Sequence, residues 1–207
     1  MKVFYNEQEK FWKGNFGNQY IKRNKSKNII NNNYSLFKKI FKKKFKINSL
    51  IELGANIGNN IVAINKILKI KKITAVEINK KACERLRKIN NVNVLNESIL
   101  KLRLNNKKFD LLIIMGVLIH IHPKYLKIVY KKIAQLSKKY VLICEYYNPK
   151  NVSVNYRGHK NKLFKNDYAG EFMKIYKNYK LIDYGFSYHL DNKYLKDDST
   201  YFLLKRT

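Results

Sequence analysis

The 207-residue sequence has few of the residues that would cross-link or anchor a chain. Its two cysteines, Cys83 and Cys144, lie far apart, which excludes a disulfide-rich scaffold and a zinc knuckle. The first ten residues contain no apolar run, so we expect no secretory signal. The longest apolar stretch, residues 111–119, is far shorter than the roughly 20 residues of a membrane span. The sequence therefore predicts a cytoplasmic protein with one structural domain and no membrane span.

Acidic residues are also scarce. Aspartate and glutamate number 14 against 44 lysines and arginines, which gives a formal net charge of +30. This charge is typical of a nucleic-acid binder or of a partner for another polyanion. The lysines are spread along the whole chain, which favours the alternative, a compositional drift toward Lys, Asn and Ile. The densest block, residues 38–46, predicts an amphipathic helix whose lysine face is solvated or touches phosphate or an anionic membrane surface.

What is present from residue 47 onward is an alternation of strand and helix patterns. Expected strands are residues 49–53, 71–78, 91–97, 109–117 and 140–146, with helices between them at 57–70, 80–89 and 123–137. A helix at 169–176 and strands at 180–189 and 200–204 follow. This order predicts an α/β, Rossmann-like class I methyltransferase fold, a seven-stranded and mostly parallel sheet with an antiparallel closing strand.

Two segments lie outside this alternation. Residues 1–46 predict a helical segment, with an Asn-rich joint at residues 31–33, that forms a lid on the domain of residues 47–207. Residues 147–166 are polar with little regular pattern, and we expect them to be a substrate-facing insertion.

The strongest local motif lies between the first strand and its helix. It is Gly-x-x-x-Gly at Gly54 and Gly58, with Glu52 two positions before the first glycine. Ligands of doubly wound folds bind at such strand ends, where glycine lets the backbone approach them. Asn56 stands where the nicotinamide fingerprint needs glycine, which disfavours a nicotinamide cofactor. An acid at position 52 suits an ammonium group and repels a pyrophosphate, which favours S-adenosylmethionine (SAM).

Three further signals follow the next strands in order. Glu77 ends the second strand, where an acid can accept both ribose hydroxyls. Glu97 and Ser98 follow the third strand at the expected level of the adenine, and Met115 and Gly116 follow the fourth. The predicted cofactor-binding residues are Glu52, Gly54, Asn56, Gly58, Glu77, Ile78, Glu97, Ser98, Met115 and Gly116, with Tyr20 and Arg23 from the lid. We expect no metal.

Residues 47–116 resemble the cofactor half of class I SAM-dependent methyltransferases. More narrowly, the chain resembles the pseudaminic-acid-biosynthesis-associated methylases, which are found with genes for nonulosonic (sialic-like) acid sugars. The matching stretches are FWKGNFGNQYIKRN at 11–24, IELGANIGNN at 51–60, GVLIHIHP at 116–123, EYYNP at 145–149, YRGHKNKLFKNDYAGEF at 156–172, LIDYGFSYH at 181–189 and DDSTYFLL at 197–204. The resemblance implies methyl transfer to a nonulosonic acid, a nucleotide-activated sugar or a related glycan intermediate.

The acceptor half of the site has several candidates. A base is needed for an oxygen nucleophile or a protonated amine, and His120, Glu145 and His159 are the predicted catalytic residues. His122 and Asp167 stay open as alternatives. The predicted substrate-binding residues combine aromatic, amide and cationic side chains that suit an acidic sugar. They are Tyr146, Tyr147, Asn148, Tyr156, Arg157, Lys162 and Lys165.

Two other functions remain open from the sequence. An RNA ribose methyltransferase would explain the positive charge, although the strand-four region, Met115 to Leu118, lacks the Pro-Pro motif of amino-methylating DNA enzymes. Neither cysteine is placed as the nucleophile of a base C5 enzyme. A non-catalytic protein with the same fold would bind SAM without turnover.

Overall fold

The computed structural model describes residues 5–24, 27–41, 45–104, 108–191 and 197–207. Its centre is a seven-stranded sheet in the order β3-β2-β1-β4-β5-β9-β8. The strands are β1 (Ser49–Leu53), β2 (Lys72–Val76), β3 (Val92–Leu95), β4 (Phe109–Met115), β5 (Ser137–Glu145), β8 (Tyr179–Ser187) and β9 (Ser199–Arg206). The first five run parallel, and β9 is antiparallel to both β5 and β8. The predicted sheet, with its antiparallel closing strand, is confirmed.

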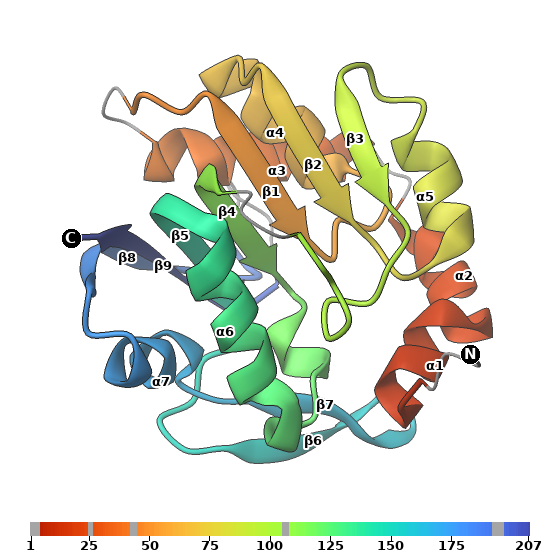
Figure 1. Cartoon of the computed structure of the whole chain (residues 1–207). Helices are drawn as coiled ribbons and strands as arrows, with labels where there is room; N and C mark the ends of the chain where they lie inside the picture. The colour runs from red at the N-terminus through yellow and green to blue at the C-terminus, as the bar shows by residue number, and fades with distance from the viewer. Residues whose placement is uncertain (1–4, 25–26, 42–44, 105–107, 192–196) are drawn as a thin grey trace.

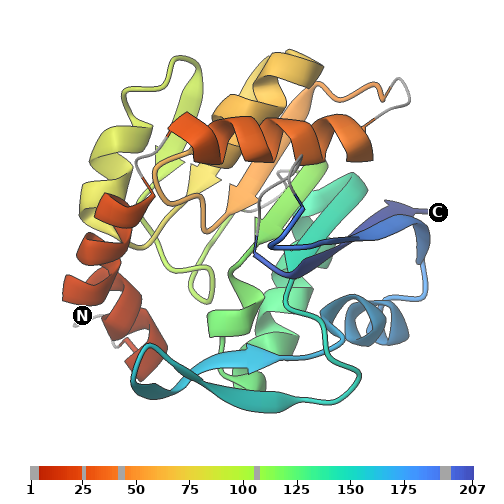
Figure 2. The same cartoon turned by 180° about the vertical axis from the view of Figure 1, so that it is seen from behind.

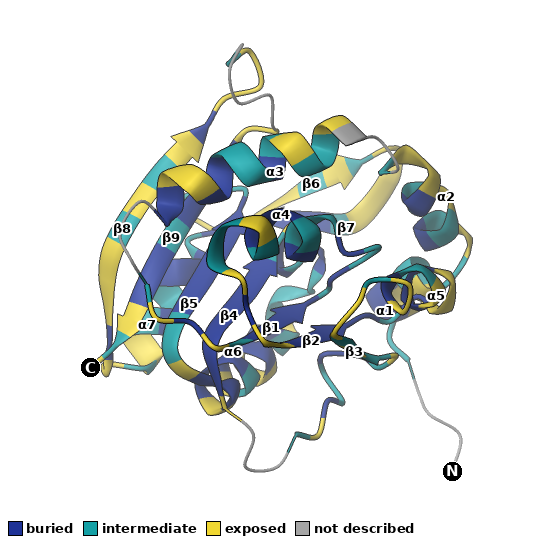
Figure 3. Cartoon of the chain, turned by 90° about the horizontal axis from the view of Figure 1, so that it is seen from above, coloured by how far each residue is buried: buried dark blue, intermediate teal, exposed yellow. Residues whose placement is uncertain are grey.

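Helices cover both faces of this sheet (Figures 1 and 2). The helices are α1 (Glu7–Lys13), α2 (Asn15–Arg23), α3 (Lys27–Ile40), α4 (Asn59–Leu68), α5 (Lys80–Leu86), α6 (Leu126–Leu136) and α7 (Tyr168–Ile175), with single 3₁₀ turns η1 (Leu118–His120) and η2 (Pro123–Tyr125). One apolar cluster joins the sheet to α3 and α4, and the other joins it to α6 and α7. The central strands are buried on both faces, as their near-continuous apolar runs require (Figure 3).

The Asn-rich stretch at residues 31–33 is not a joint, and this prediction is wrong. It lies in the middle of α3, because Ile30, Tyr34 and Phe37 share one apolar stripe with a spacing of three to four residues. Asn33 is buried on that stripe, where its amide donates to the Asn60 side chain at 2.7 Å. The polar composition of residues 31–33 suggested a joint, although the apolar residues on either side have the spacing of a helix.

The basic block at 38–46 does not form one helix. Helix α3 ends at Ile40, and Phe41 and Phe45 pack into the cluster beneath it. Residues 42–44 lie outside the described residues. The burial of Phe37 and Ile40 makes α3 part of the layer packed on α4 rather than of a lid.

Residues 147–166 contain regular structure that the sequence did not predict. They form an antiparallel hairpin of β6 (Val152–Tyr156) and β7 (His159–Lys165). Arg157 and Gly158 join the strands with positive φ of 50° and 83°, the signs of a two-residue type I′ turn. Type I′ turns usually have the sequence Asn-Gly. Here arginine occupies the first position, so the sequence lacks the usual signal of a hairpin turn. The hairpin crosses below the carboxyl edge of the sheet and reaches α1 (Figures 1 and 2).

Candidate active site

A cavity of about 560 Å³ opens at the carboxyl ends of β1, β2, β4 and β5. Its floor is formed by the loops that follow these strands. Its walls come from α1 and α2 on one side and from the hairpin turn on another. Small-molecule sites of doubly wound folds occupy this position, and this volume lies in their usual range.

Gly54 shapes the first of these loops. Its φ is +80°, which strains any residue with a side chain, and a Cβ there would stand 2.4 Å from Val117 Cγ2. Glycine is therefore required both by the turn and by the close approach of the loop after β4. Gly58, by contrast, packs against Ile89 and Leu86 and does not line the cavity. The structure gives Gly58 a role in starting α4.

Glu77 is held rigidly at the end of β2. One carboxylate oxygen accepts the amide of Asn56 at 2.8 Å, and the other accepts the amide of Asn79 at 2.7 Å. Burial raises the pKa of this carboxyl, and the backbone hydrogen bonds oppose that shift. The backbone amide of Ile78 is a further partner of this carboxylate, whose two oxygens together have about four acceptor positions, so room is left for a ligand hydroxyl. The carboxylate is thus pre-organised as an acceptor that lines the cavity.

Glu52 lies one layer below the cavity and does not line it. Its Oε1 accepts the side-chain amide of Asn60 at 2.7 Å, and Asn60 in turn accepts from Asn33. Asn33, Asn59 and Asn60 are the groups that border the cavity here. The acid at position 52 therefore acts on the cavity through an asparagine.

Helix α1 closes the cavity by contacts to distant parts of the chain. Ser98, which follows β3, donates a short hydrogen bond to Glu9, and Asn79 donates to the carbonyl of Trp12 at 3.1 Å. The side chain of Gln8 donates to the carbonyl of Asn161 in the hairpin at 3.1 Å. The helix therefore bridges the predicted adenine side of the cavity and the hairpin.

His120 lies in η1 with its ring buried between aromatic side chains. Ring centroids of Trp12 and Tyr156 are 4.5 Å and 5.0 Å away. Nδ1 is 2.7 Å from the carbonyl oxygen of Lys162, which can only accept, so Nδ1 carries the proton and Nε2 keeps its lone pair. Burial lowers the pKa of His120 to about 4, so the ring is neutral at neutral pH. It is suited to accept a proton at Nε2.

Glu145 does not resemble a free base. Its Oε1 accepts the amides of Val117 and Leu118 at 2.9 Å each, and Oε2 accepts that of Ile119 at 3.5 Å. Burial raises its pKa to about 7, and these amides oppose the shift. The carboxyl group thus holds the loop that carries Gly116 and His120, which is a positioning role.

This assignment predicts a pH-dependent effect of Glu145→Gln on stability. Because the folded-state pKa is raised, the folded protein binds the extra proton between pH 4.5 and 7, and the carboxyl group's contribution to stability falls as the pH rises across that range. Relative to the Gln variant, the native protein should lose about 2 kcal/mol from pH 5 to pH 7 and level off above about pH 8. Urea unfolding of both proteins at several pH values measures this difference, and a pH-independent difference would contradict the raised pKa.

The predicted residues divide clearly between those that line the cavity and those that do not. Lining it are Tyr20, Arg23, Gly54, Asn56, Glu77, Ile78, Glu97, Ser98, Met115, Gly116, His120, Glu145, Tyr146, Tyr156 and Arg157. Outside its lining are Glu52, Gly58, Tyr147, Asn148, His159, Lys162 and Lys165. The open alternative His122 also lines it, although its Nδ1 accepts the amide of Lys124 at 3.3 Å.

The predicted residues outside the cavity have local partners. The ring of exposed His159 packs against Phe11 and Phe16, and that of Tyr147 lies 6.0 Å from Phe202. The ammonium group of Lys162 pairs with Glu7 at 3.2 Å. Asn148 donates to the Lys150 carbonyl, and Lys165 lies over the Tyr146 ring. These contacts give His159 and Lys162 roles in joining the hairpin to α1.

Sequence reasoning missed several residues that line the cavity. They are Gln8, Glu9, Asn33, Asn59, Asn60, Asn79 and Asp197, among others. Asn79 had a readable signal, because it precedes a helix and its side chain caps that helix by accepting from Ala82. Glu9 and Gln8 had none, since their partners lie 89 and 153 residues away.

The residues present fit SAM. The Glu77 carboxylate is a group of the kind that accepts ribose hydroxyls, Ser98 and Ile78 also line the cavity, and several asparagines line the side near β1. A Cβ at Gly116 would meet nothing within 4 Å, so the backbone there faces open space that a ligand can fill. Among the described residues, no cluster of three His, Cys, Asp or Glu side chains can hold a metal ion.

The comparisons agree with this geometry. Residues 50–139, from β1 to the start of β5, match a family model described as a methyltransferase domain. A comparison with curated proteins found no match. The plantazolicin methyltransferase BpumL, crystallised with S-adenosylhomocysteine (SAH), has a TM-score of 0.66 at 13% identity over 97% of this chain and 94% of its own. The Burkholderia thailandensis 1,6-didemethyltoxoflavin-N1-methyltransferase, crystallised with 1,6-didemethyltoxoflavin and SAH, has a TM-score of 0.69 at 10% identity over 97% of this chain and 87% of its own.

Residues 50–139 match a methyltransferase domain, and the chain shares the fold of methyltransferases crystallised with SAH; together these findings support a SAM-dependent methyltransferase. The matched residues run from β1 through β4 into the first residues of β5, and the same sheet continues through β9 and β8. The narrower resemblance to the pseudaminic-acid-associated methylases stays a prediction. No helix among the described residues is long and apolar enough to cross a membrane.

Proposed function

We propose that this enzyme methylates an oxygen or nitrogen of a small anionic acceptor, namely a nonulosonic acid sugar or its nucleotide-activated form. The observation that carries the proposal is that Arg157 and His120 line the same cavity. A guanidinium group at the hairpin turn can bind a carboxylate or phosphate through two hydrogen bonds. The neutral ring of His120 supplies the proton acceptor that a hydroxyl nucleophile needs.

The rest of the cavity supports a sugar ring as acceptor. The rings of Trp12 and Tyr156 lie within 6.4 Å of each other beside His120, and both side chains line the cavity. Aromatic faces pack well against the C–H faces of sugars, and they exclude water from the reacting atoms. When bound, SAM supplies an electrophilic methyl group. The protein's part is to orient the acceptor and to remove its proton.

Other assignments of the site are part of the same proposal. Glu77 binds the ribose of SAM, Gly116 and the asparagines near β1 border its methionine end, and α1 with Tyr20 and Arg23 covers it. The Burkholderia thailandensis enzyme supports a small-molecule acceptor, since it was crystallised with 1,6-didemethyltoxoflavin bound. The test is a methyl-transfer assay with labelled SAM and a panel of free and nucleotide-activated nonulosonic acids, with neutral sugars and RNA as comparison acceptors. Transfer to RNA alone would overturn the proposal.

Arg157→Ala should raise the KM for the anionic acceptor by roughly 10- to 100-fold, because a charge-assisted pair contributes about 1.5–3 kcal/mol. The Kd for SAM should change less than threefold, which calorimetry measures in parallel with acceptor kinetics. Lys160→Ala is the matched control, since Lys160 is an exposed cation of the same hairpin that does not line the cavity. Equal losses in acceptor and SAM binding would place Arg157 at the cofactor instead.

A further inference from the structure

The outer strand of the sheet exposes an unusual amount of apolar surface. Strand β8 pairs only with β9 and ends the sheet order, so its other edge is open to solvent (Figure 3). Six large hydrophobic side chains on it and just beyond it are 41% to 66% exposed: Leu181, Ile182, Tyr184, Phe186, Tyr188 and Leu190. We call these six residues the apolar rim. Large apolar side chains exposed together on one edge strand are typical of an interaction site.

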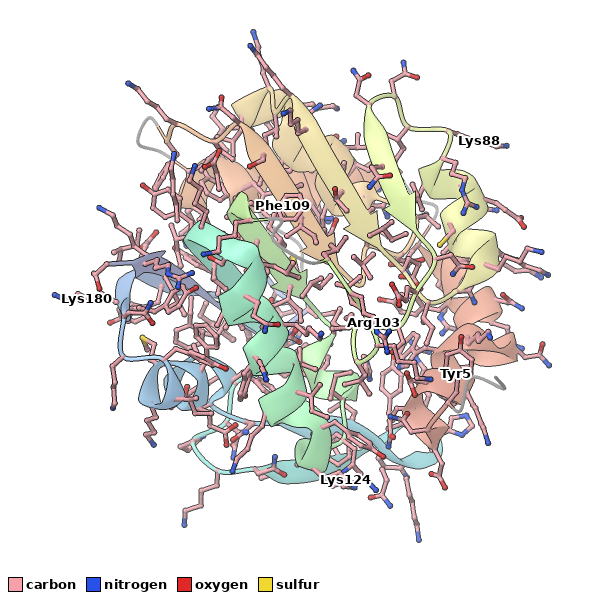
Figure 4. All side chains as sticks on the ribbon, in the orientation of Figure 1. Tyr5, Lys88, Arg103, Phe109, Lys124 and Lys180 are labelled. Carbon is pink, nitrogen blue, oxygen red and sulfur yellow. The ribbon has the colours of Figure 1, made fainter. Side chains whose placement is uncertain are left out.

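Lysines adjoin the first end of the apolar rim. Lys174 at the end of α7, Lys177 in the following loop, and Lys180 and Lys205 on the paired strands are all exposed. Lys180 and Lys205 stand directly opposite each other in the β8–β9 register, an arrangement of like charges that is unfavourable by itself. Figure 4 shows Lys180 at the outer margin of the molecule. Within the part of the chain that the structure describes, these four lysines form no ion pair.

Acidic groups are fewer at this end of the rim. Asp183 accepts the Tyr201 hydroxyl at 3.4 Å and keeps its negative charge, whereas Asp191 and Asp198 lie at the other end, where Asp198 pairs with His189 at 2.9 Å. Four lysines against the single carboxylate of Asp183 leave a positive surface next to an apolar one. A partner that covers both must present negative charge and apolar volume together.

We propose that the apolar rim and its lysines dock this enzyme on the surface of an anionic lipid membrane. Anionic headgroups would neutralise the lysines, and the six side chains would enter the boundary between headgroups and acyl chains. Nucleic acid fits the rim less well, because bases stack on aromatic rings and leave Leu181, Ile182 and Leu190 without partners. A second copy fits less well too, since it would bring a chain of formal charge +30 against another.

Sedimentation with vesicles tests the proposal on the full chain. Vesicles with equal parts of phosphatidylglycerol and phosphatidylcholine should bind the protein, and vesicles of phosphatidylcholine alone should bind at least tenfold more weakly. Phe186→Ser/Leu190→Ser should lower binding to the anionic vesicles at least tenfold. Lys177→Gln/Lys180→Gln should lower it by about fivefold for each lysine, with a weaker salt dependence.

Matched controls separate the rim from the general charge. Ile128 is 43% exposed on α6, against 44% for Ile182, so Ile128→Ser should leave binding unchanged while Ile182→Ser weakens it. Lys127→Gln/Lys131→Gln removes the same charge from exposed positions on α6 and should also leave it nearly unchanged. All variants should keep native SAM affinity and melting behaviour, which excludes misfolding.

Three results would overturn the proposal. If vesicle binding falls equally in the rim variants and the control variants, the net charge of the protein alone accounts for the binding. A dimer that dissociates in the rim variants would make the rim an interface between copies of the chain. Tighter binding of single-stranded RNA than of vesicles, lost with Phe186→Ser/Leu190→Ser, would make it a nucleic-acid surface. None of these outcomes bears on methyl transfer, which the acceptor assay tests separately.

Discussion

Glu77→Ala should abolish measurable SAM binding at micromolar cofactor. The carboxylate is the charged acceptor at the end of β2, and its two oxygens already accept the amides of Asn56 and Asn79. Hydrogen bonds from ribose hydroxyls to a charged group contribute about 1.5–3 kcal/mol each. Their loss, together with loosening of the Asn56 loop, predicts an affinity reduced by roughly 100-fold or more. Isothermal titration with SAM and SAH measures it.

Two variants make this prediction specific. Glu77→Gln retains one acceptor oxygen and should lose less affinity than Glu77→Ala. Glu97→Ala also changes an acid that lines the cavity, but among the described residues no backbone amide donates to the Glu97 carboxylate, so this change should cost less than tenfold. If Glu77→Ala binds SAM with native affinity while remaining folded, the ribose assignment is wrong.

His120→Asn should lower kcat by roughly 100- to 1,000-fold with little change in SAM affinity. The Asn side-chain amide can still donate to the Lys162 carbonyl in place of Nδ1, but it has no basic lone pair where Nε2 stands. General-base catalysis typically contributes 10²–10⁴-fold, which sets the expected scale. Single-turnover measurements with saturating SAM and acceptor isolate this step from binding.

The control for His120 is its neighbour in the same segment. His122 also lines the cavity, but its Nδ1 serves as a cap for Lys124, so His122→Ala should reduce kcat less than tenfold. A kcat for His120→Asn within threefold of the native value would show that the proton leaves by another route.

The sheet and the location of the cavity could be predicted from the sequence for a physical reason. Strands buried on both faces give long apolar runs, and ligands of parallel sheets bind where those strands end. Gly54, Glu77 and Gly116 each directly follow one of these strands. Their positions at the carboxyl ends of the strands therefore predicted that they lie close together, although their contacts were not known. The antiparallel closing pair was readable as well, because the sequence between β8 and β9 has no helical pattern.

The hairpin and the lid contacts could not be predicted in the same way. Strand β6 has little burial and many polar residues, and the turn uses Arg157 where a standard signal has asparagine. The partnership of Glu9 with Ser98 joins residues 89 apart and leaves no local pattern. Glu145 was expected to be a base, and only the structure shows its oxygens turned to backbone amides. Such roles depend on tertiary placement.

The most direct test of the account is calorimetric titration of the native protein with SAM and with SAH. The cavity at the strand ends, with Glu77 pre-organised and α1 closing one side, predicts binding of both ligands near micromolar Kd, which is about −8 kcal/mol. That affinity should fall in Glu77→Ala and persist in His120→Asn. Absence of binding to either ligand by the folded native protein would contradict the assignment of the cavity to SAM, and with it the proposed methyl transfer.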